Sequence, residues 1–208
     1  MLHITTHGKE TKLENIPSIS TSCLVNKNCA LNMKKVDPIT GEKSICASCF
    51  SNTYQKMRPS LKQALINNSV VLSNHIWNTL DLPLVNAAFF RLESFGDLIN
   101  TIHLENYCRL AERNPSTSFS LWTKQTEITE NYFDHRRKPK NLRLIYSSLF
   151  VNTREDIKTF KYAFQVFTVY TKKYVSANKI KINCGKSRCL TCQKCYTGKT
   201  KYINEIKK

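Results

Sequence analysis

Glycine is scarce in this 208-residue chain, and long apolar runs are absent. The five glycines form neither a G-x-x-x-x-G-K-[ST] loop nor a G-x-G-x-x-G turn, which argues against ATP-driven and NAD-dependent mechanisms. No window approaches the roughly 18 apolar residues of a membrane span. The start of the chain has charged and polar residues where a signal peptide would have its apolar region. We therefore expect a soluble, cytoplasmic protein.

Acidic residues are also few, 15 against 32 Lys and Arg, which gives a formal net charge of +17. Solubility requires only about 2–8 charges on a small domain, so the excess indicates a polyanionic partner, with nucleic acid the default. The other interpretation is a lysine-rich genome that places Lys on every exposed face. We favour nucleic acid because the charge is uneven: residues 172–208 hold eleven Lys or Arg and a single acid, Glu205. A membrane surface fits less well, since this segment lacks a long apolar face.

Cations and tyrosines are interleaved in this basic tail, a composition that suits nucleic acid. Cations bind phosphates, and tyrosine rings can stack on unpaired bases. A second basic run, Arg136-Arg137-Lys138-Pro139-Lys140, is either a solvated loop or an extension of the same face. The predicted nucleic-acid-binding residues are Lys172, Lys173, Lys186, Arg188, Lys194, Tyr196, Lys199, Lys201, Arg136 and Arg137.

Strand and helix patterns alternate through the middle of the chain. Apolar spacing predicts helices over residues 59–80, 98–111, 126–133 and 152–160, and strands over 87–92, 118–122, 142–146 and 162–170. This alternation predicts right-handed βαβ units in an α/β fold, with a mainly parallel sheet that is open or an incomplete (βα) barrel. We expect one structural unit: a loop-rich cysteine segment (1–58), an α/β core (59–171) and a basic cysteine-rich segment (172–208).

Four cysteines near the end of the chain are the strongest motif. Cys184, Cys189, Cys192 and Cys195 fall within twelve residues, and in a reducing compartment such density indicates metal ligands rather than disulfides. Four close thiolates are stable only around zinc or an iron–sulfur cluster. The compact spacing tilts the prediction toward iron–sulfur, although it can also be closed around zinc.

A second set, Cys23, Cys29, Cys46 and Cys49, is spread over the start of the chain. Two pairs separated by a loop are typical of zinc, but the set could equally hold an iron–sulfur cluster. A third arrangement brings ligands from both ends together in one shared site. Burial as small hydrophobic residues is the alternative for all eight. The ninth cysteine, Cys108, lies on the apolar face of its helix and is predicted to be a core residue.

Polar residues follow the predicted strands, where α/β folds place their sites. Asp97 could act as a base, a nucleophile or a substrate acceptor, or could cap the next helix. Lys124 ends the next strand on the same edge and could bind a phosphate, unless it is an ordinary surface lysine. The candidate catalytic residues are Asp97, Arg91, Glu93 and Lys124. Because His75, His103 and His135 lack a metal-binding spacing, we expect structural or surface roles for them.

Several motifs together resemble the bacteriophage gene 88 product family. They are the cysteine sets, the segment Phe90-Arg91-Leu92-Glu93-Ser94-Phe95-Gly96-Asp97 and the segment Ser120-Leu121-Trp122-Thr123-Lys124. The resemblance spans residues 18–196 and implies a phage origin, hence the host cytoplasm, but no reaction. The first cysteine set is also distantly similar to that of radical-SAM enzymes, which pair a cysteine-bound cluster with a partial barrel. It departs from their C-x3-C-x2-C triad, which argues against a cluster-driven radical reaction.

Two functional hypotheses follow from the sequence. In the first, a phage-encoded metal- or iron–sulfur-binding protein modifies nucleic acid at a site around Asp97. In the second, a non-enzymatic module stabilised by zinc binds nucleic acid or a host protein and regulates it. The metal is the main discriminator, because an iron–sulfur cluster favours the first hypothesis and structural zinc the second.

Overall fold

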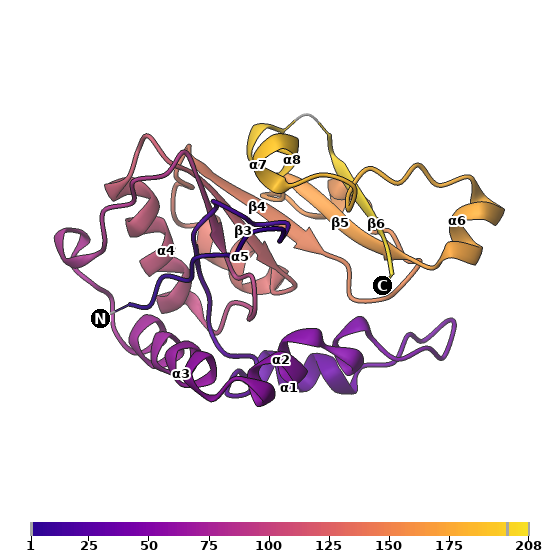
Figure 1. Cartoon of the computed structure of the whole chain (residues 1–208), viewed down its shortest axis with the longest axis horizontal. Coiled ribbons are helices and arrows are strands. Elements are labelled where there is room, and N and C mark those ends of the chain that lie inside the picture. Colours follow the sequence, from indigo (N-terminus) through magenta and orange to yellow (C-terminus); the bar gives the residue numbers. More distant parts are fainter. Residues whose placement is uncertain (1, 199, 208) are drawn as a thin grey trace.

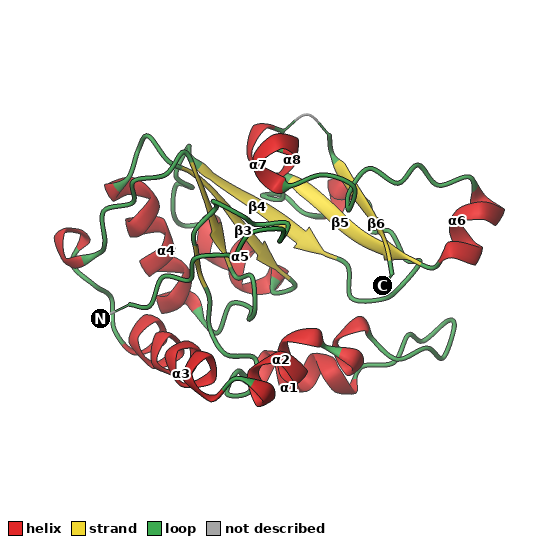
Figure 2. Ribbon diagram, viewed as in Figure 1, coloured by secondary structure: helices red, strands yellow, loops and turns green. Residues whose placement is uncertain are grey.

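Six parallel strands form one sheet, and their order across the sheet is their order along the chain (Figures 1 and 2). The computed structural model describes residues 2–198 and 200–207. The strands are β1 (Ser18–Ile19), β2 (Phe89–Leu92), β3 (Ser118–Thr123), β4 (Leu142–Ser147), β5 (Gln165–Tyr170) and β6 (Tyr202–Ile206). Every neighbouring pair is parallel. The predicted α/β class with a mainly parallel sheet is confirmed.

The helices connect the strands, and three of them lie between β1 and β2. They are α1 (Lys27–Lys34), α2 (Phe50–Met57), α3 (Pro59–Asn74), α4 (Thr101–Arg113), α5 (Thr126–Phe133), α6 (Lys172–Asn178), α7 (Cys189–Cys192) and α8 (Lys194–Thr197). Short 3-10 turns lie at Ile45–Ser48, Thr79–Asp81 and Ile157–Thr159. None of these described helices is long and apolar enough to cross a membrane.

The two faces of the sheet differ in what covers them. Right-handed crossovers between strands in sequential order place the connecting helices on one face. On that face, Leu92, Leu121 and Leu144 belong to the main hydrophobic cluster together with residues of α4. The other face is covered in part by α8, whose Tyr196 ring centroid lies 4.7 Å from that of Phe89. In Figure 1, α7 and α8 lie above the sheet, and α1 and α2 lie below it.

Most predicted elements are found, but the prediction for residues 152–160 is wrong. A helix was expected to begin at Asn152. Instead Asn152 has a left-handed backbone (φ 66°), and its side chain accepts a hydrogen bond from the Thr171 backbone N–H at 2.8 Å. The segment contains only the 3-10 turn Ile157–Thr159, capped by Asp156. The side chain of Asn152 thus fixes a loop between β4 and β5.

Glu105 on α4 predicts a pH dependence of stability. Burial opposes its ionisation, but hydrogen bonds from Tyr132 and Arg109 outweigh this and lower the pKa of the carboxyl. A folded-state pKa below the unfolded value stabilises the protein above about pH 4.3, and this stabilisation is lost as the pH falls through the folded-state value. Glu105→Gln should therefore flatten the acid side of the stability profile. Urea unfolding between about pH 3 and pH 6 measures it; an unchanged profile would contradict this assignment.

Candidate functional site

Four cysteines from the first 50 residues gather beyond the carboxyl ends of the strands. Cys23 lies shortly after β1, Cys29 is in α1, and Cys46 and Cys49 flank the start of α2. The Cys23 thiol donates to the Ser51 hydroxyl at 3.6 Å, and its proximity to Cys49 raises the pKa of Cys23 and lowers that of Cys49. The Cys29 thiol is close enough to Cys46 and Cys49 for electrostatic interaction. The fold thus brings together a set that the sequence spreads over 27 positions.

The segment that carries these cysteines has almost no hydrophobic core. Between residues 20 and 58, Cys23 is the only buried hydrophobic residue, and the other buried residues are polar. Gln55 holds two of the neighbours together: it accepts from the Ser22 hydroxyl at 2.6 Å and donates to the Cys23 sulfur at 3.3 Å. Six large apolar side chains are exposed: Val25, Leu31, Val36, Ile39, Phe50 and Met57. A segment that buries so little apolar surface requires another source of stability, such as a bound metal.

Asp97 lies buried at the same edge and joins the turn after β2 to the end of β3. Its carboxylate accepts hydrogen bonds from the Thr123 hydroxyl at 2.5 Å, the Lys124 N–H at 3.1 Å and the Leu98 N–H at 2.8 Å. Burial raises the pKa of Asp97, and the charge of Lys124 opposes this. The predicted capping role is wrong, because α4 begins at Thr101 and Asn100 supplies its cap.

Glu93 occupies a strained position directly after β2. Its φ is 60°, which is uncommon for a residue with a side chain. The buried carboxylate accepts from the Tyr107 hydroxyl at 2.6 Å and from the N–H and hydroxyl of Thr21 at 3.1 Å, and the His103 imidazole lies 3.4 Å away. Burial raises the pKa of Glu93 to about 7, although these donors oppose the shift. Strain of this kind persists where the surrounding contacts enforce it, often at functional sites.

Gly96 allows the turn after β2 to approach the segment after β1. A Cβ at position 96 would lie 2.6 Å from Glu93 Oε2 and closer still to the Thr21 carbonyl oxygen. Real Cβ atoms do not approach backbone so closely. Only glycine therefore permits Glu93, Asp97 and Thr21 to pack as they do.

Replacing this glycine should be destabilising. We expect Gly96→Ala to lower the free energy of unfolding by about 2–3 kcal/mol, because overpacking a buried site forces the backbone apart. Gly8→Ala is the matched control, since a Cβ at position 8 meets nothing within 4 Å. Urea denaturation of the two variants makes the comparison. Equal stability in both would show that the turn can move aside without cost.

Lys124 brings a positive charge to this edge. Its ammonium donates to the Ser147 hydroxyl at 3.1 Å. Burial favours the neutral thiols of Cys46 and Cys49, whereas the positive charge of Lys124 favours their thiolates. The negative charge of Asp97 is near enough to Cys29 and Cys46 to contribute to raising the pKa of both thiols. We call this group of thiols, Asp97 and Lys124 the edge site.

Arg91 is not part of the edge site, and the prediction that placed it there is wrong. Side chains alternate along a strand, so Arg91 points to the face opposite Leu92, where its guanidinium lies over the Trp122 ring at 3.8 Å. Its Nε is buried and has no hydrogen-bond partner among the described residues. The electrostatic neighbours of Arg91 include Cys184, Cys189 and Cys195, which belong to the other cysteine set.

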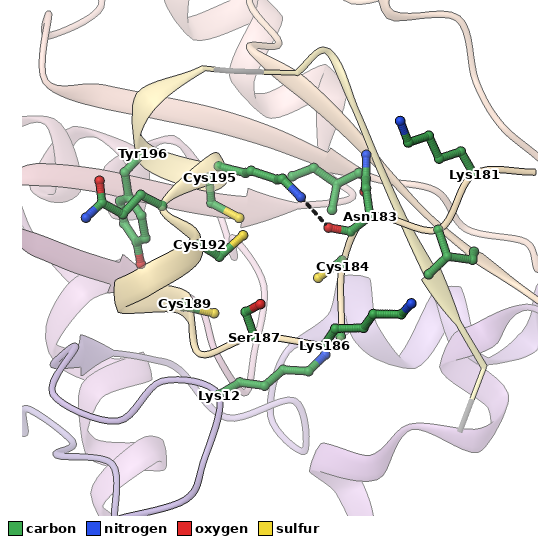
Figure 3. A pocket seen from close by; sticks show the side chains of 15 residues that line it. Lys12, Lys181, Asn183, Cys184, Lys186, Ser187, Cys189, Cys192, Cys195 and Tyr196 are labelled. Carbon is green, nitrogen blue, oxygen red and sulfur yellow. Dashed lines mark hydrogen bonds between the residues drawn. The ribbon is translucent and has the colours of Figure 1, made fainter.

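The four C-terminal cysteines surround a cavity of their own. Cys184, Cys189, Cys192 and Cys195 line a space of about 280 Å³ that is also bordered by Lys12, and Figure 3 shows their sulfur atoms around it. The described structure therefore separates the two cysteine sets into two groups. In the described part of the chain, no group of three or more His, Cys, Asp or Glu side chains is arranged to hold a metal ion as it stands. Cys108 is buried in the main cluster.

The predicted nucleic-acid-binding residues are divided between the ends of the sheet. Lys172 and Lys173 are exposed at the start of α6, directly after β5, and so lie at the carboxyl-terminal edge. Arg136 and Arg137 precede β4 and lie at the opposite edge, with Arg136 3.9 Å from Glu105. These two arginines therefore do not extend the face that Lys172 and Lys173 present.

The remaining predicted residues lie near the C-terminal cavity or just before β6. Lys186 is exposed at the cavity, Arg188 pairs with Glu14 at 3.2 Å, and Lys194 donates to the Asn183 carbonyl at 2.6 Å. Lys201 is exposed, and Lys199 lies outside the described residues. Tyr196 is buried, with 3% of its surface exposed. The prediction that Tyr196 stacks on a base is wrong, because its ring packs on Phe89.

Comparison with known proteins gives one match. The model of a protein family described as Gene product 88 matches residues 5–204, which includes both cysteine groups and all six strands except the last two residues of β6. No curated protein and no solved structure matches the chain significantly.

Proposed function

The chain belongs to the Gene product 88 family, and we propose that it binds an iron–sulfur cluster at the edge site and modifies nucleic acid there. The observation that carries the proposal is the convergence of four distant cysteines beside Asp97 and Lys124 at the carboxyl ends of parallel strands. This edge is where parallel α/β folds build their active sites.

The chemistry of the donor set fits a metal–thiolate group. Thiolates are the ligand form of cysteine, and the interaction with Cys23 lowers the pKa of Cys49, which favours its thiolate. The Cys49 thiolate is stabilised by Cys23 and by the backbone N–H groups of Asn52 and Ser51, whereas burial disfavours it. The N-cap position of Cys49 on α2 adds the positive end of a helix dipole.

Charge supports nucleic acid as the partner. The exposed Lys172 and Lys173 share the carboxyl-terminal edge with the edge site, and the net charge of the chain is +17. Sequence-independent affinity for nucleic acid comes mainly from such cations on phosphates.

A non-enzymatic zinc module is the second candidate. It is favoured by the saturation of Asp97, whose carboxylate already accepts three hydrogen bonds from Thr123, Lys124 and Leu98. A carboxylate bound in this way can serve the fold alone. In this interpretation the cysteines would hold structural zinc, and the basic surface would bind nucleic acid or a host protein without chemistry.

Anaerobic purification of the full chain tests the two candidates. The proposal predicts a coloured protein with iron and acid-labile sulfide, whose content falls in Cys46→Ser/Cys49→Ser and is unchanged in Cys108→Ala. Nucleoside mass spectrometry of DNA and RNA incubated with the reduced protein should then reveal a modified base or sugar, which Asp97→Asn abolishes. A colourless protein with stoichiometric zinc would contradict the enzyme and support the module.

A further inference from the structure

Arg91 presents an electrostatic problem that no described side chain solves. Its guanidinium is stacked on Trp122 on the face of the sheet beneath α8, and its Nε is buried without a hydrogen-bond partner. None of the ion pairs among the described residues involves Arg91. Arg91 as a whole is only partly exposed, and a partly desolvated cation without a counter-charge is unfavourable. A negative group is therefore expected next to it.

Four thiols lie where that negative group should be. Burial lowers the pKa of Arg91, while Tyr196, Cys195, Cys189 and Cys184 oppose this. The same interaction is seen from the thiols. Burial raises the pKa of Cys189 and of Cys195, and among the neighbouring charges Arg91 opposes this shift most strongly. The packing agrees with this placement, because Trp122, on which Arg91 stacks, lies in the same hydrophobic cluster as Cys184 and Cys195. Arg91 is thus the nearest cation to Cys189 and Cys195, whereas Lys12 has that place at Cys184.

The backbone that carries these thiols is also constrained. Gln193 has a left-handed conformation (φ 53°) between α7 and α8, which directs Cys189, Cys192 and Cys195 around one space. Among the described residues 171–201, Tyr196 is the only buried hydrophobic residue. As in the N-terminal segment, apolar burial alone does not account for the order of this chain segment.

We infer that Cys184, Cys189, Cys192 and Cys195 hold a second metal–thiolate centre and that Arg91, which lies on the sheet beneath it, is its counter-ion. Four thiolates around Zn²⁺, or around a [4Fe–4S]²⁺ core, leave about two uncompensated negative charges, so the centre supplies the anion that Arg91 lacks. The cavity of about 280 Å³ exceeds the roughly 10–15 Å³ that one water needs, and therefore has room for either group.

Four lysines also border the cavity: Lys12, Lys181, Lys186 and Lys194. Lys12 forms an ion pair with Glu205, and Glu205 Oε2 lies 4.0 Å from the Cys184 sulfur. Lys194 donates to the Asn183 carbonyl, and Lys181 and Lys186 are exposed and screened by water. Arg91 differs from these lysines because its buried Nε has no hydrogen-bond partner among the described residues. It is a positioning residue, because it stabilises the bound thiolates without being a ligand.

Substitution at the ligands and at the counter-ion tests this assignment in the full chain. Cys192→Ser should remove one metal centre per chain and leave the edge site loaded, whereas Cys46→Ser/Cys49→Ser should do the reverse. Arg91→Met should release the C-terminal metal to a chelator about 10–100-fold faster, the usual effect of losing a group that supports the ligands. Arg91→Lys, which keeps the charge, should restore most of the retention.

Arg143→Met is the matched control, since Arg143 also stacks on an aromatic ring of the chain, Phe164 at 4.5 Å. It should release metal at the wild-type rate. Zinc, or iron with sulfide, in the Cys46→Ser/Cys49→Ser chain identifies the centre, and either supports the assignment. If Arg91→Met does not fold, the metal content of Cys192→Ser decides. Undiminished metal in Cys192→Ser, or wild-type release from folded Arg91→Met, would overturn the inference.

Discussion

Removal of metal should loosen residues 20–58 while the sheet stays folded. This segment has Cys23 as its only buried hydrophobic residue, so a bound metal would supply most of its stability, as in small metal-dependent domains. We expect amide exchange in α1 and α2 to accelerate about 100-fold or more after chelation. The amides of β3 and β4 should stay protected, because these strands lie within the main hydrophobic cluster.

Hydrogen–deuterium exchange of the loaded and chelated full chain measures this difference. Cys108→Ala is a suitable control, since it changes a buried cysteine outside both groups and should leave the response to chelation unchanged. Equal exchange in α1 and α2 with and without metal would show that polar contacts such as those of Gln55 suffice to hold the segment.

The affinity for nucleic acid should fall steeply with salt concentration. It should also fall when basic residues are removed from the carboxyl-terminal edge of the sheet. With about six phosphate contacts, affinity for an oligonucleotide should fall roughly 10³-fold between about 50 and 200 mM salt. Lys172→Ala/Lys173→Ala should weaken binding and reduce the salt slope for single strands by about 1.4, the loss of two contacts. Both lysines are exposed beside the edge site.

The matched control removes the same charge from the opposite edge. Arg136→Ala/Arg137→Ala deletes two exposed cations that precede β4 and should leave the salt slope near its wild-type value. Fluorescence anisotropy with a labelled oligonucleotide across a salt series gives both slopes. If the two double variants weaken binding equally, the charge acts diffusely and the carboxyl-terminal edge is not the binding face.

The fold was predictable where apolar periodicity was strong. Helix α5 has the predicted bounds, and β3 and β4 extend one residue beyond them, because their buried apolar side chains alternate with polar ones. Strand β1 was not predicted because it has only two residues. Helices α1 and α2 were missed because their buried residues, Asn32, Ser51 and Gln55, are polar.

The candidate site was predictable in its ligands but not in its arrangement. Spacing alone singled out both cysteine groups, yet only the fold shows that they are separate. The sequence did not show which face of the sheet Arg91 occupies, because aromatic and apolar residues alternate with no clear polar face in β2. The structure places Arg91 on the face opposite Leu92. The Glu93 network was missed because Thr21 and Tyr107 come from elements distant in the chain; a buried Glu after a strand was its only local signal.

Counting metal centres tests the central claim, that each cysteine group binds its own metal. Elemental analysis of the anaerobically purified full chain, Cys46→Ser/Cys49→Ser and Cys192→Ser/Cys195→Ser gives the count directly. The account predicts two centres in the unmodified chain and one in each double variant. A chain that carries all four substitutions should have none. A metal-free unmodified chain, or a single centre that either double variant abolishes, would contradict it.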